Sequence, residues 1–313
     1  MRIATLTLNP AIDQTLKIDN FRPGRVNRVQ SMQSEASGKG VNVASFLVDY
    51  GYAVSVTGYL GEDNSAIFEQ FFASKQIDDR FVRIPGSTRT NVKVVDEANQ
   101  QTTDINMPGL RPPPEALDAL TNTVTQLAPS CDWFVLSGSL PPGIPSEIYS
   151  TLINQLKQQG KQTLLDTSGD ALRAGIRANP TIIKPNLEEL QQLTGQTLEG
   201  EGEILRAARQ LLNEDLRLVV VSMGKEGALF VEQASALRAT PPAISIKKTF
   251  GAGDAMVAGL IAAQRQNLNL ADTARLATAF SLAAITRLDY HLPDLTTVER
   301  HLHQVSIRIL SDN

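Results

Sequence analysis

Cysteine and histidine are scarce in this chain of 313 residues. Cys131 is the only cysteine, so no internal disulfide can form, and a reducing cytoplasm is the expected location. Two of the three histidines stand together at His301 and His303, and they offer no convincing set of zinc ligands. The sequence therefore argues against a disulfide-stabilised module and against a zinc enzyme.

Long apolar runs and an excess of basic charge are missing as well. The sequence contains no run of 18 apolar residues, which a membrane-spanning helix would need. The chain starts with the strand-like segment 3–8 rather than a signal segment. The formal net charge is −4, whereas nucleic-acid-binding proteins usually present a basic face. We therefore expect no membrane partner and no nucleic-acid partner.

Glycine-rich turns are what the sequence does contain, and the most informative one lies within residues 249–259. Gly251 and Gly253 flank Ala252, Asp254 follows, and an apolar helical run begins. The first N–H groups of a helix lack partners within the helix and, with the helix dipole, form an anion site. Asp254 at its mouth suits a base that takes a proton from a hydroxyl attacking a phosphoryl group. An ordinary turn with Asp254 as helix N-cap is the alternative.

Two better-known phosphate-binding motifs are excluded. Met256 stands where G-x-G-x-x-G requires its last glycine, and Gly40 follows Gly38-Lys39 where a P-loop requires serine or threonine. A dinucleotide-dependent oxidoreductase is therefore a poor hypothesis, and phosphate chemistry must use another architecture.

A second glycine-rich turn, Gly38-Lys39-Gly40, leads through Asn42 into an apolar helical pattern that ends at Gly51. A lysine beside free backbone amides suits an anionic substrate, although an exposed lysine at a helix start is the alternative. Asp13 follows the predicted first strand. In open α/β sheets ligands gather at such strand ends.

The order of elements predicts the fold class. From residue 115 onward, predicted strands at 133–136, 162–166, 181–184 and 218–222 alternate with helices, which implies a parallel sheet covered on both faces. Helices are predicted at 255–266, 271–287 and 294–309, and an extended segment at 244–248. The segments at about 14–34 and 88–107 lack helical periodicity, and the second of the two extended pieces in the first segment is predicted to begin at Arg25. We expect one domain over 1–313, with these two segments forming a small β-sheet lid.

The whole chain resembles the ribokinase/PfkB family of ATP-dependent carbohydrate kinases. The resemblance rests on Leu8–Asp13, Ser37–Ala44, Ser137–Pro141, Lys184-Pro185-Asn186 and residues 248–259, in the expected order; Phe250 replaces a usually small or β-branched residue. It implies a ribokinase-like three-layer αβα sandwich with a mostly parallel central sheet. It also implies ATP and Mg²⁺ as cofactors and a small-molecule sugar phosphate as substrate.

Within the family, Gly38-Lys39-Gly40 and Asp104 are similar to the branch that converts fructose 1-phosphate to fructose 1,6-bisphosphate. Branches acting on fructose 6-phosphate or tagatose 6-phosphate remain alternatives, and the former tends to have glycine and arginine at positions 39 and 104. A kinase for a neutral sugar or nucleoside is disfavoured by Lys39 and Arg89. A non-catalytic nucleotide-binding regulator is disfavoured by Asp254.

The resemblance also implies a role for each matching residue. Asp254 would be the catalytic base, and Gly251, Ala252 and Gly253 would form the anion hole. The sugar phosphate would meet Asp13, Arg28, Gly38, Lys39, Asn42, Arg89 and Ser137. The nucleotide would lie against Lys184, Asn186, Ser222, Gly224 and Gly227, with Mg²⁺ near Glu189. Exposed strand edges on the lid favour pairing with a second copy, so a homodimer is expected.

Overall fold

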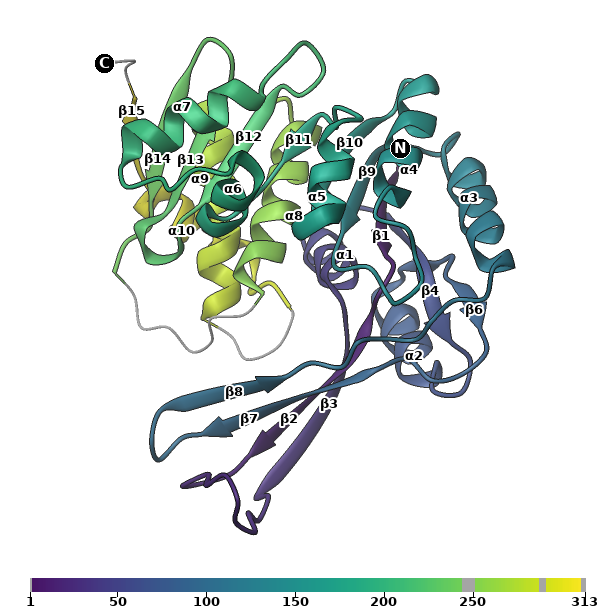
Figure 1. Cartoon of the computed structure of the whole chain (residues 1–313). Helices are drawn as coiled ribbons and strands as arrows, with labels where there is room; N and C mark the ends of the chain where they lie inside the picture. Colours follow the sequence, from purple (N-terminus) through teal and green to yellow (C-terminus); the bar gives the residue numbers. More distant parts are fainter. Residues whose placement is uncertain (1, 244–250, 287–290, 311–313) are drawn as a thin grey trace.

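The computed structural model describes residues 2–243, 251–286 and 291–310. Helices cover both faces of a large central sheet, and a smaller sheet projects from one side of it (Figure 1). The predicted fold class, a three-layer α/β sandwich with a small separate sheet, is confirmed. Among the described residues, no helix combines the length and apolar character needed to cross a bilayer.

The large sheet has the strand order β15-β14-β13-β12-β11-β10-β9-β1-β4-β5, with β6 also beside β4. From β12 to β4, β5 and β6 all pairs are parallel, whereas β13, β14 and β15 add antiparallel strands at one edge. The carboxyl ends of the parallel strands therefore share one edge of the sheet, where ligands gather in such folds. The bounds are β1 Arg2–Thr7, β4 Val54–Gly61, β5 Asp78–Asp79, β6 Val82–Ile84, β9 Cys131–Ser137, β10 Gln162–Asp166, β11 Ile182–Ile183, β12 Leu218–Ser222, β13 Ala228–Val231, β14 Ala236–Thr240 and β15 Ser306–Ile309.

Two hydrophobic cores lie on the two faces of this sheet. Successive strand residues alternate between them, so Ile3 packs in one core and Ala4 in the other. The first core holds α1 (Lys39–Asp49), α2 (Ala66–Lys75), α8 (Ala252–Arg265), α9 (Leu270–Ile285) and α10 (Leu295–Gln304). The second holds α3 (Glu115–Leu127), α4 (Ile148–Gln158), α5 (Gly169–Ile176), α6 (Leu187–Thr194) and α7 (Glu201–Leu211).

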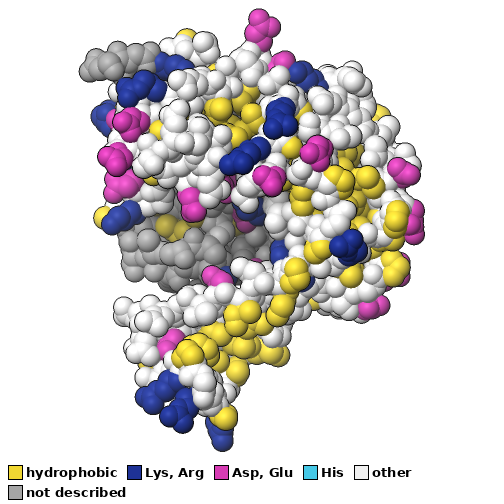
Figure 2. Space-filling view, viewed as in Figure 1, with side chains coloured by type: hydrophobic (Ala, Val, Ile, Leu, Met, Phe, Trp, Pro, Cys, Tyr) yellow, Lys and Arg dark blue, Asp and Glu magenta, His cyan; other side chains and the backbone are white. Residues whose placement is uncertain are grey.

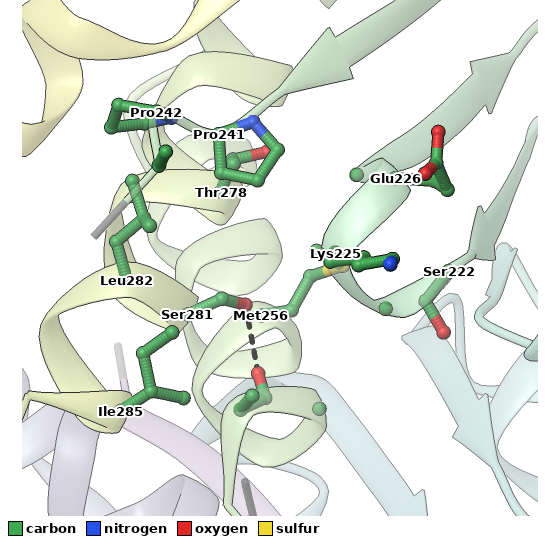
Figure 3. Close-up of a pocket in the computed structure, with 15 residues that line it drawn as sticks. Ser222, Lys225, Glu226, Pro241, Pro242, Met256, Thr278, Ser281, Leu282 and Ile285 are labelled. Carbon is green, nitrogen blue, oxygen red and sulfur yellow. Dashed lines mark hydrogen bonds between the residues drawn. The ribbon is translucent and has the colours of Figure 1, made fainter. Parts of the chain in front are cut away.

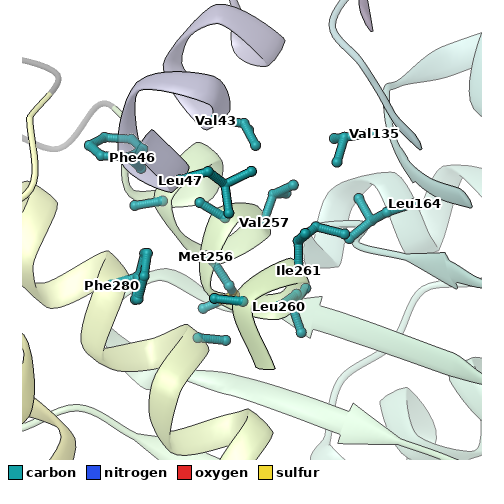
Figure 4. Close-up of a cluster of buried hydrophobic side chains, with 14 of the residues drawn as sticks. Val43, Phe46, Leu47, Val135, Leu164, Met256, Val257, Leu260, Ile261 and Phe280 are labelled. Atoms are coloured by element: carbon teal, nitrogen blue, oxygen red, sulfur yellow. The ribbon is translucent and has the colours of Figure 1, made fainter. Parts of the chain in front are cut away.

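Helix α8 occupies the middle of the first core, between α1 and α9. Its residues Val257 and Leu260 are fully buried and lie among side chains of both neighbours, including Leu47 of α1 (Figure 4). Gly259 permits the close approach of α9, because a Cβ atom there would lie 2.7 Å from Cα of Ala277. This packing fixes the position of the first turn of α8.

The small sheet has the order β3-β2-β7-β8 and is formed by β2 (Ala11–Lys17), β3 (Ser31–Ser37), β7 (Thr90–Asp96) and β8 (Gln101–Ile105). The prediction that an extended piece begins at Arg25 was wrong. Strand β3 begins at Ser31, because Ser31 is the partner of Lys17 at the end of β2. The intervening connection turns at Gly24, whose φ of 74° favours glycine.

The C-terminal end of the chain differs from its prediction. A helix over 294–309 was expected, but α10 ends at Gln304 and residues from Ser306 form β15 beside β14. Ser306-Ile307-Arg308-Ile309 alternates polar and apolar residues, which is the period of a strand rather than a helix. The predicted extended segment 244–248 lies outside the described residues.

Candidate active site

The first turn of α8 presents Asp254 at the carboxyl edge of the large sheet. Gly251 caps the helix with a φ of 82°, a left-handed conformation that suits glycine. Its carbonyl oxygen accepts the hydrogen bond from Ala255 N at 2.9 Å, which starts the helix. Asp254 therefore lies in the first turn, and only 8% of its surface is exposed.

The other glycine-rich turn meets this one across the core. Gly38 precedes α1 with a φ of 135°, and a Cβ there would lie 2.8 Å from Cγ2 of Thr7 in β1. Asn42, one turn into α1, is buried and donates a hydrogen bond from Nδ2 to Oδ2 of Asp254 at 2.8 Å. The two turns thus form one site.

A buried charge cluster lies beside these turns. Asp166, at the end of β10, is 1% exposed and binds two ammonium groups: Lys39 Nζ at 3.0 Å and Lys184 Nζ at 3.1 Å. Burial pushes the pKa of Asp166 upward, but Lys184 and Lys39 outweigh it and hold that pKa below its usual value. Burial likewise disfavours the charge of Lys39, yet Asp166 and Asp254 raise its pKa above the usual range. Asp166 and Lys39 therefore remain ionised.

Sequence reasoning did not assign Asp166 to the site. The available signal was its position at the carboxyl end of the predicted strand 162–166, where a charged residue follows a buried apolar run. That signal identified Asp13 but was not applied to Asp166.

The carboxyl group of Asp254 has a perturbed proton affinity. Burial, the largest cause, raises its pKa to about 6, and the charge of Asp166 adds to this effect. Lys39, the hydrogen bond from Asn42 and Lys184 oppose it. A carboxyl group with such a pKa is ionised at neutral pH and is a stronger base than an exposed aspartate.

A cavity of about 450 Å³ lies between the small sheet and the large one. It brings together most of the predicted site residues, namely Asp13, Gly38, Lys39, Asn42, Arg89, Lys184, Asn186, Glu189, Ser222, Gly251, Gly253 and Asp254. It is also lined by Lys93 and Asp104, which sequence reasoning did not place in the site. The signal available for Lys93 was the alternation of polar and apolar residues within 90–95. This alternation puts Lys93 and Asn91 together on the polar face of the predicted strand.

A second cavity, of about 690 Å³, adjoins the first at Ser222 and Gly253. Its walls include the predicted Gly224, Gly227 and Ala252, and apolar side chains such as Met256 and Leu282 (Figure 3). Ser281 Oγ donates a 2.8 Å hydrogen bond to the Ala252 carbonyl oxygen and ties α9 to the first turn of α8. An apolar cavity of this size suits a flat aromatic base next to an anion site.

Arg89 lines the first cavity, but its guanidinium group binds backbone. Nε donates to Pro10 O at 3.2 Å, Nη1 to Met107 O at 2.7 Å and Nη2 to Asn9 O at 2.9 Å. Arg89 thereby joins the base of the small sheet to the turn after β1.

Two predicted residues do not line either cavity. Ser137 is buried at the end of β9, and its hydroxyl donates to Leu6 O at 3.5 Å. Arg28 is exposed in the connection between β2 and β3, at the end of the small sheet remote from Asp13.

Asn186 and Glu189 form a capping box at the start of α6. Asn186 Oδ1 accepts from Glu189 N at 2.8 Å, and Glu189 Oε2 accepts from Asn186 N at 2.8 Å. Both residues also line the first cavity. Within residues 2–243, 251–286 and 291–310, no group of three or more His, Cys, Asp or Glu residues could hold a metal ion unaided.

Known proteins are similar to this chain in both architecture and sequence. The chain matches the model of the pfkB family of carbohydrate kinases over residues 6–294. It is 48% identical over 311 residues to the 1-phosphofructokinase of Rhodobacter capsulatus, a match that covers 99% of this chain and 98% of the relative. Two structures of phosphofructokinase-2 from Escherichia coli are similar to this chain. The complex with potassium has a TM-score of 0.91 and 28% sequence identity, and the tetrameric inhibited form has a TM-score of 0.89 and 28% sequence identity. Each of the two matches covers 96% of this chain and 98% of the chain in the solved structure.

Proposed function

Since the chain belongs to the pfkB family of carbohydrate kinases, we propose that it transfers a phosphoryl group from ATP to fructose 1-phosphate. The product is fructose 1,6-bisphosphate. The Rhodobacter capsulatus relative, matched over nearly the full length of both chains, carries the name 1-phosphofructokinase and supports this substrate. The observation that carries the proposal is the buried Asp254, placed at a helix N-terminus where the two cavities meet.

In the proposed reaction, Asp254 takes the proton of the C6 hydroxyl as the hydroxyl oxygen attacks the γ-phosphorus of ATP. The bond between the γ-phosphorus and the oxygen that bridges it to the β-phosphorus breaks, and ADP leaves. Asn42 holds Oδ2 by its hydrogen bond, which orients the carboxylate and leaves Oδ1 to face the hydroxyl. Loss of the proton strengthens the nucleophile. Catalysis of phosphoryl transfer is otherwise mostly positioning and charge stabilisation.

The transferred group is held by the N–H groups at the start of α8, from Gly251, Ala252 and Gly253. Lys184 lies near this turn, since a Cβ on Gly253 would be 3.6 Å from Lys184 Nζ. Lys39 shares Asp166 with Lys184, so both ammonium groups can meet the negative oxygens at the reacting end. The adenine ring occupies the apolar cavity beside Met256 and Leu282.

The proposal includes Mg²⁺ held near Glu189. The residues present fit such an ion, because Mg²⁺ takes one or two carboxylates and completes its shell with phosphate oxygens and water. Glu189 lines the cavity, and one of its oxygens, Oε2, is already engaged in the capping box. When bound, the ion neutralises charge on the nucleotide phosphates.

The small sheet acts as a lid in this proposal. Its cavity face carries Asp13, Asn91 and Lys93, opposite Asp254 across the 450 Å³ cavity. Closure on the sugar would exclude water and suppress ATP hydrolysis. Hydrogen exchange of strands β2 and β7 with and without fructose 1-phosphate tests this, and unchanged protection would contradict it.

A homodimer through the lid is also part of the proposal. The face of the small sheet turned away from the cavity is apolar and includes Met32, 64% exposed, and Ile105, 46% exposed (Figure 2). An exposed apolar sheet face favours association with a second copy. The similar Escherichia coli enzyme has a tetrameric inhibited form, so the sedimentation experiment must distinguish a dimer from a tetramer. We expect a dimer for the wild type and a monomer for Met32→Lys; a wild-type monomer at micromolar concentration would exclude association through the lid.

The substrate is tested with a coupled assay of ADP release. Fructose 1-phosphate, fructose 6-phosphate, tagatose 6-phosphate and ribose are compared by kcat/KM. We expect fructose 1-phosphate to exceed the others by at least about 10-fold, because anchoring one end of the sugar places the other. A preference for fructose 6-phosphate would overturn the substrate and leave the kinase family unaffected.

A further inference from the structure

Asp13 and Asn91 form a side-chain pair across two parallel strands of the small sheet. They are register partners in β2 and β7, and both line the cavity of about 450 Å³. Asn91 Nδ2 donates a hydrogen bond to Asp13 Oδ1 at 3.1 Å. The carboxylate that we expect to hold sugar hydroxyls is therefore itself held by a neighbouring amide.

The other end of the Asn91 amide is fixed by the backbone. Its Oδ1 accepts a hydrogen bond from Met107 N at 3.1 Å, in the segment that follows β8. A backbone N–H can only donate and a carboxylate can only accept, so the two partners determine which end of the amide faces each of them. Exchanging the oxygen and the nitrogen of Asn91 would break both bonds.

A chain of hydrogen bonds continues from Met107 to the base of the small sheet. The carbonyl oxygen of Met107 accepts from Arg89 Nη1 at 2.7 Å, and the other bonds of Arg89 reach the turn after β1. The chain thus runs from Arg89 through Met107 and Asn91 to Asp13. It connects the attachment of the sheet to a carboxylate in the cavity.

Nearby charges compete for the Asp13 carboxylate. Arg89 and Lys93 both attract it electrostatically. A carboxylate free to rotate would turn toward these cations, and sugar hydroxyls would then have to compete with full charges for its oxygens. The hydrogen bond from Asn91 limits this rotation, as neighbouring hydrogen bonds do for other binding groups.

We propose that Asn91 is a positioning residue, which holds the Asp13 carboxylate in the orientation that accepts hydrogen bonds from the sugar hydroxyls. This inference rests on the proposed function and adds a residue through which the small sheet controls sugar recognition. Asn91 acts through Asp13 and not on the reacting atoms. Its loss therefore matters only while Asp13 is present.

A double-mutant cycle tests this dependence, because coupling between two residues appears as non-additivity. The kcat/KM for fructose 1-phosphate is measured for wild type, Asn91→Ala, Asp13→Ala and the double variant. We expect Asn91→Ala alone to lower it about 10- to 100-fold, since a misplaced binding group loses most of its effect. In the Asp13→Ala background the same change should cost less than about 2-fold. The KM for ATP should stay within about 2-fold of wild type throughout.

Asn91→Asp separates the two bonds of the amide. Aspartate has nearly the same size and still offers an oxygen to Met107 N, but it replaces the donor by a second carboxylate facing Asp13. The loss in kcat/KM should therefore be at least as large as for Asn91→Ala. A smaller loss would mean that the bond to Met107 matters and the bond to Asp13 does not.

Asn64→Ala is the matched control. Asn64 also makes two hydrogen bonds near the base of the sheet, accepting from Thr88 N at 2.8 Å and donating to Thr88 O at 2.9 Å, and it does not line the cavity. Its removal should lower the free energy of unfolding and have the same effect on kcat/KM with and without Asp13. Coupling of Asn64 to Asp13 as strong as that of Asn91 would point to general loosening and overturn the inference.

Other outcomes overturn the inference as well. Equal losses from Asn91→Ala with and without Asp13 would mean that Asn91 only supports the sheet. No loss from Asn91→Ala, or none from Asp13→Ala, would remove the role of the pair. If turnover is too slow, the dissociation constant of the sugar phosphate from titration calorimetry completes the same cycle. A wild type that prefers another sugar phosphate overturns the proposed substrate alone, and the cycle is then measured with that sugar.

Discussion

Asn42 Nδ2 and Asp254 Oδ2 are joined by a 2.8 Å hydrogen bond, although the two residues are 212 positions apart in the chain. Each lies in the first turn of a helix that follows a glycine, α1 after Gly38 and α8 after Gly251. The bond therefore couples the two glycine-rich turns and fixes the direction in which the carboxylate faces.

Asp254→Asn should lower kcat by about 10² to 10⁴-fold, because the amide cannot accept the hydroxyl proton. Asn keeps the shape of the side chain and an oxygen that can accept from Asn42. Nucleotide binding, measured by titration calorimetry, should remain within about 3-fold of wild type. Retention of more than about a tenth of the wild-type kcat would exclude Asp254 as the base.

The pH dependence of kcat/KM for the sugar should show an acidic limb near pH 6. The pKa of Asp254 is raised to about 6, and only the ionised carboxylate can accept a proton, so activity falls as the pH drops through this value. The hydrogen bond from Asn42 lowers that pKa. Asn42→Ala should therefore move the limb to higher pH, and a limb that moves to lower pH would contradict the assignment.

Asp254→Asn should also make the protein more stable at pH 8. The folded-state pKa of about 6 lies above the ordinary value of 3.8, so burying the ionised group destabilises the fold at high pH. The gain in free energy of unfolding should be about 1 to 3 kcal/mol at pH 8, shrink as the pH falls below about 6, and vanish below about pH 4. Denaturant unfolding at these pH values checks it; a gain that does not depend on pH would have another origin.

Arg89→Ala should loosen the attachment of the small sheet. Three carbonyl oxygens, of Asn9, Pro10 and Met107, lose their donor, which should reduce the free energy of unfolding by about 2 kcal/mol. The KM for fructose 1-phosphate should rise because the sheet carries residues that we propose to bind the sugar, whereas the KM for ATP should stay unchanged. Arg89→Lys should recover less than half of either loss, since lysine lacks the planar set of donors. An increase confined to the KM for ATP would place Arg89 on the other substrate.

Two glycines in helices should respond oppositely to alanine. At Gly259 the new methyl group would lie 2.7 Å from Cα of Ala277, so Gly259→Ala should destabilise the protein by about 1 to 3 kcal/mol. At Gly202 in α7 the nearest atom is the end of the Arg206 side chain at 3.5 Å. Gly202→Ala should stabilise by up to about 1 kcal/mol, because alanine favours a helix. Equal effects in thermal unfolding would mean that the α8–α9 contact is not tight.

The sequence was most informative where a local pattern fixes the chemistry. The alternation of strands and helices predicted the layers, and the glycine-rich turn predicted the location of Asp254. The family was predicted from the resemblance that several motifs along the chain carry. Asp166 and Lys93 were not assigned, because their place in the site depends on partners brought in by strand order and register. The three carbonyl partners of Arg89 come from two distant turns, which no periodicity encodes. The strand at 306–309 was misassigned because four residues give too short a signal against an adjoining helix.

Strand β1 lies inside the large sheet, between β4 and β9. Ile3 has Val54 as its partner on one side and Trp133 on the other. During synthesis, β1 is among the first segments to leave the ribosome, yet its second neighbour follows only after more than a hundred further residues. Until then one edge of an apolar strand keeps unpaired backbone groups, which is a condition for misassociation of nascent chains. The part of the chain that precedes β9 therefore cannot complete its fold as an independent unit and has to wait for β9.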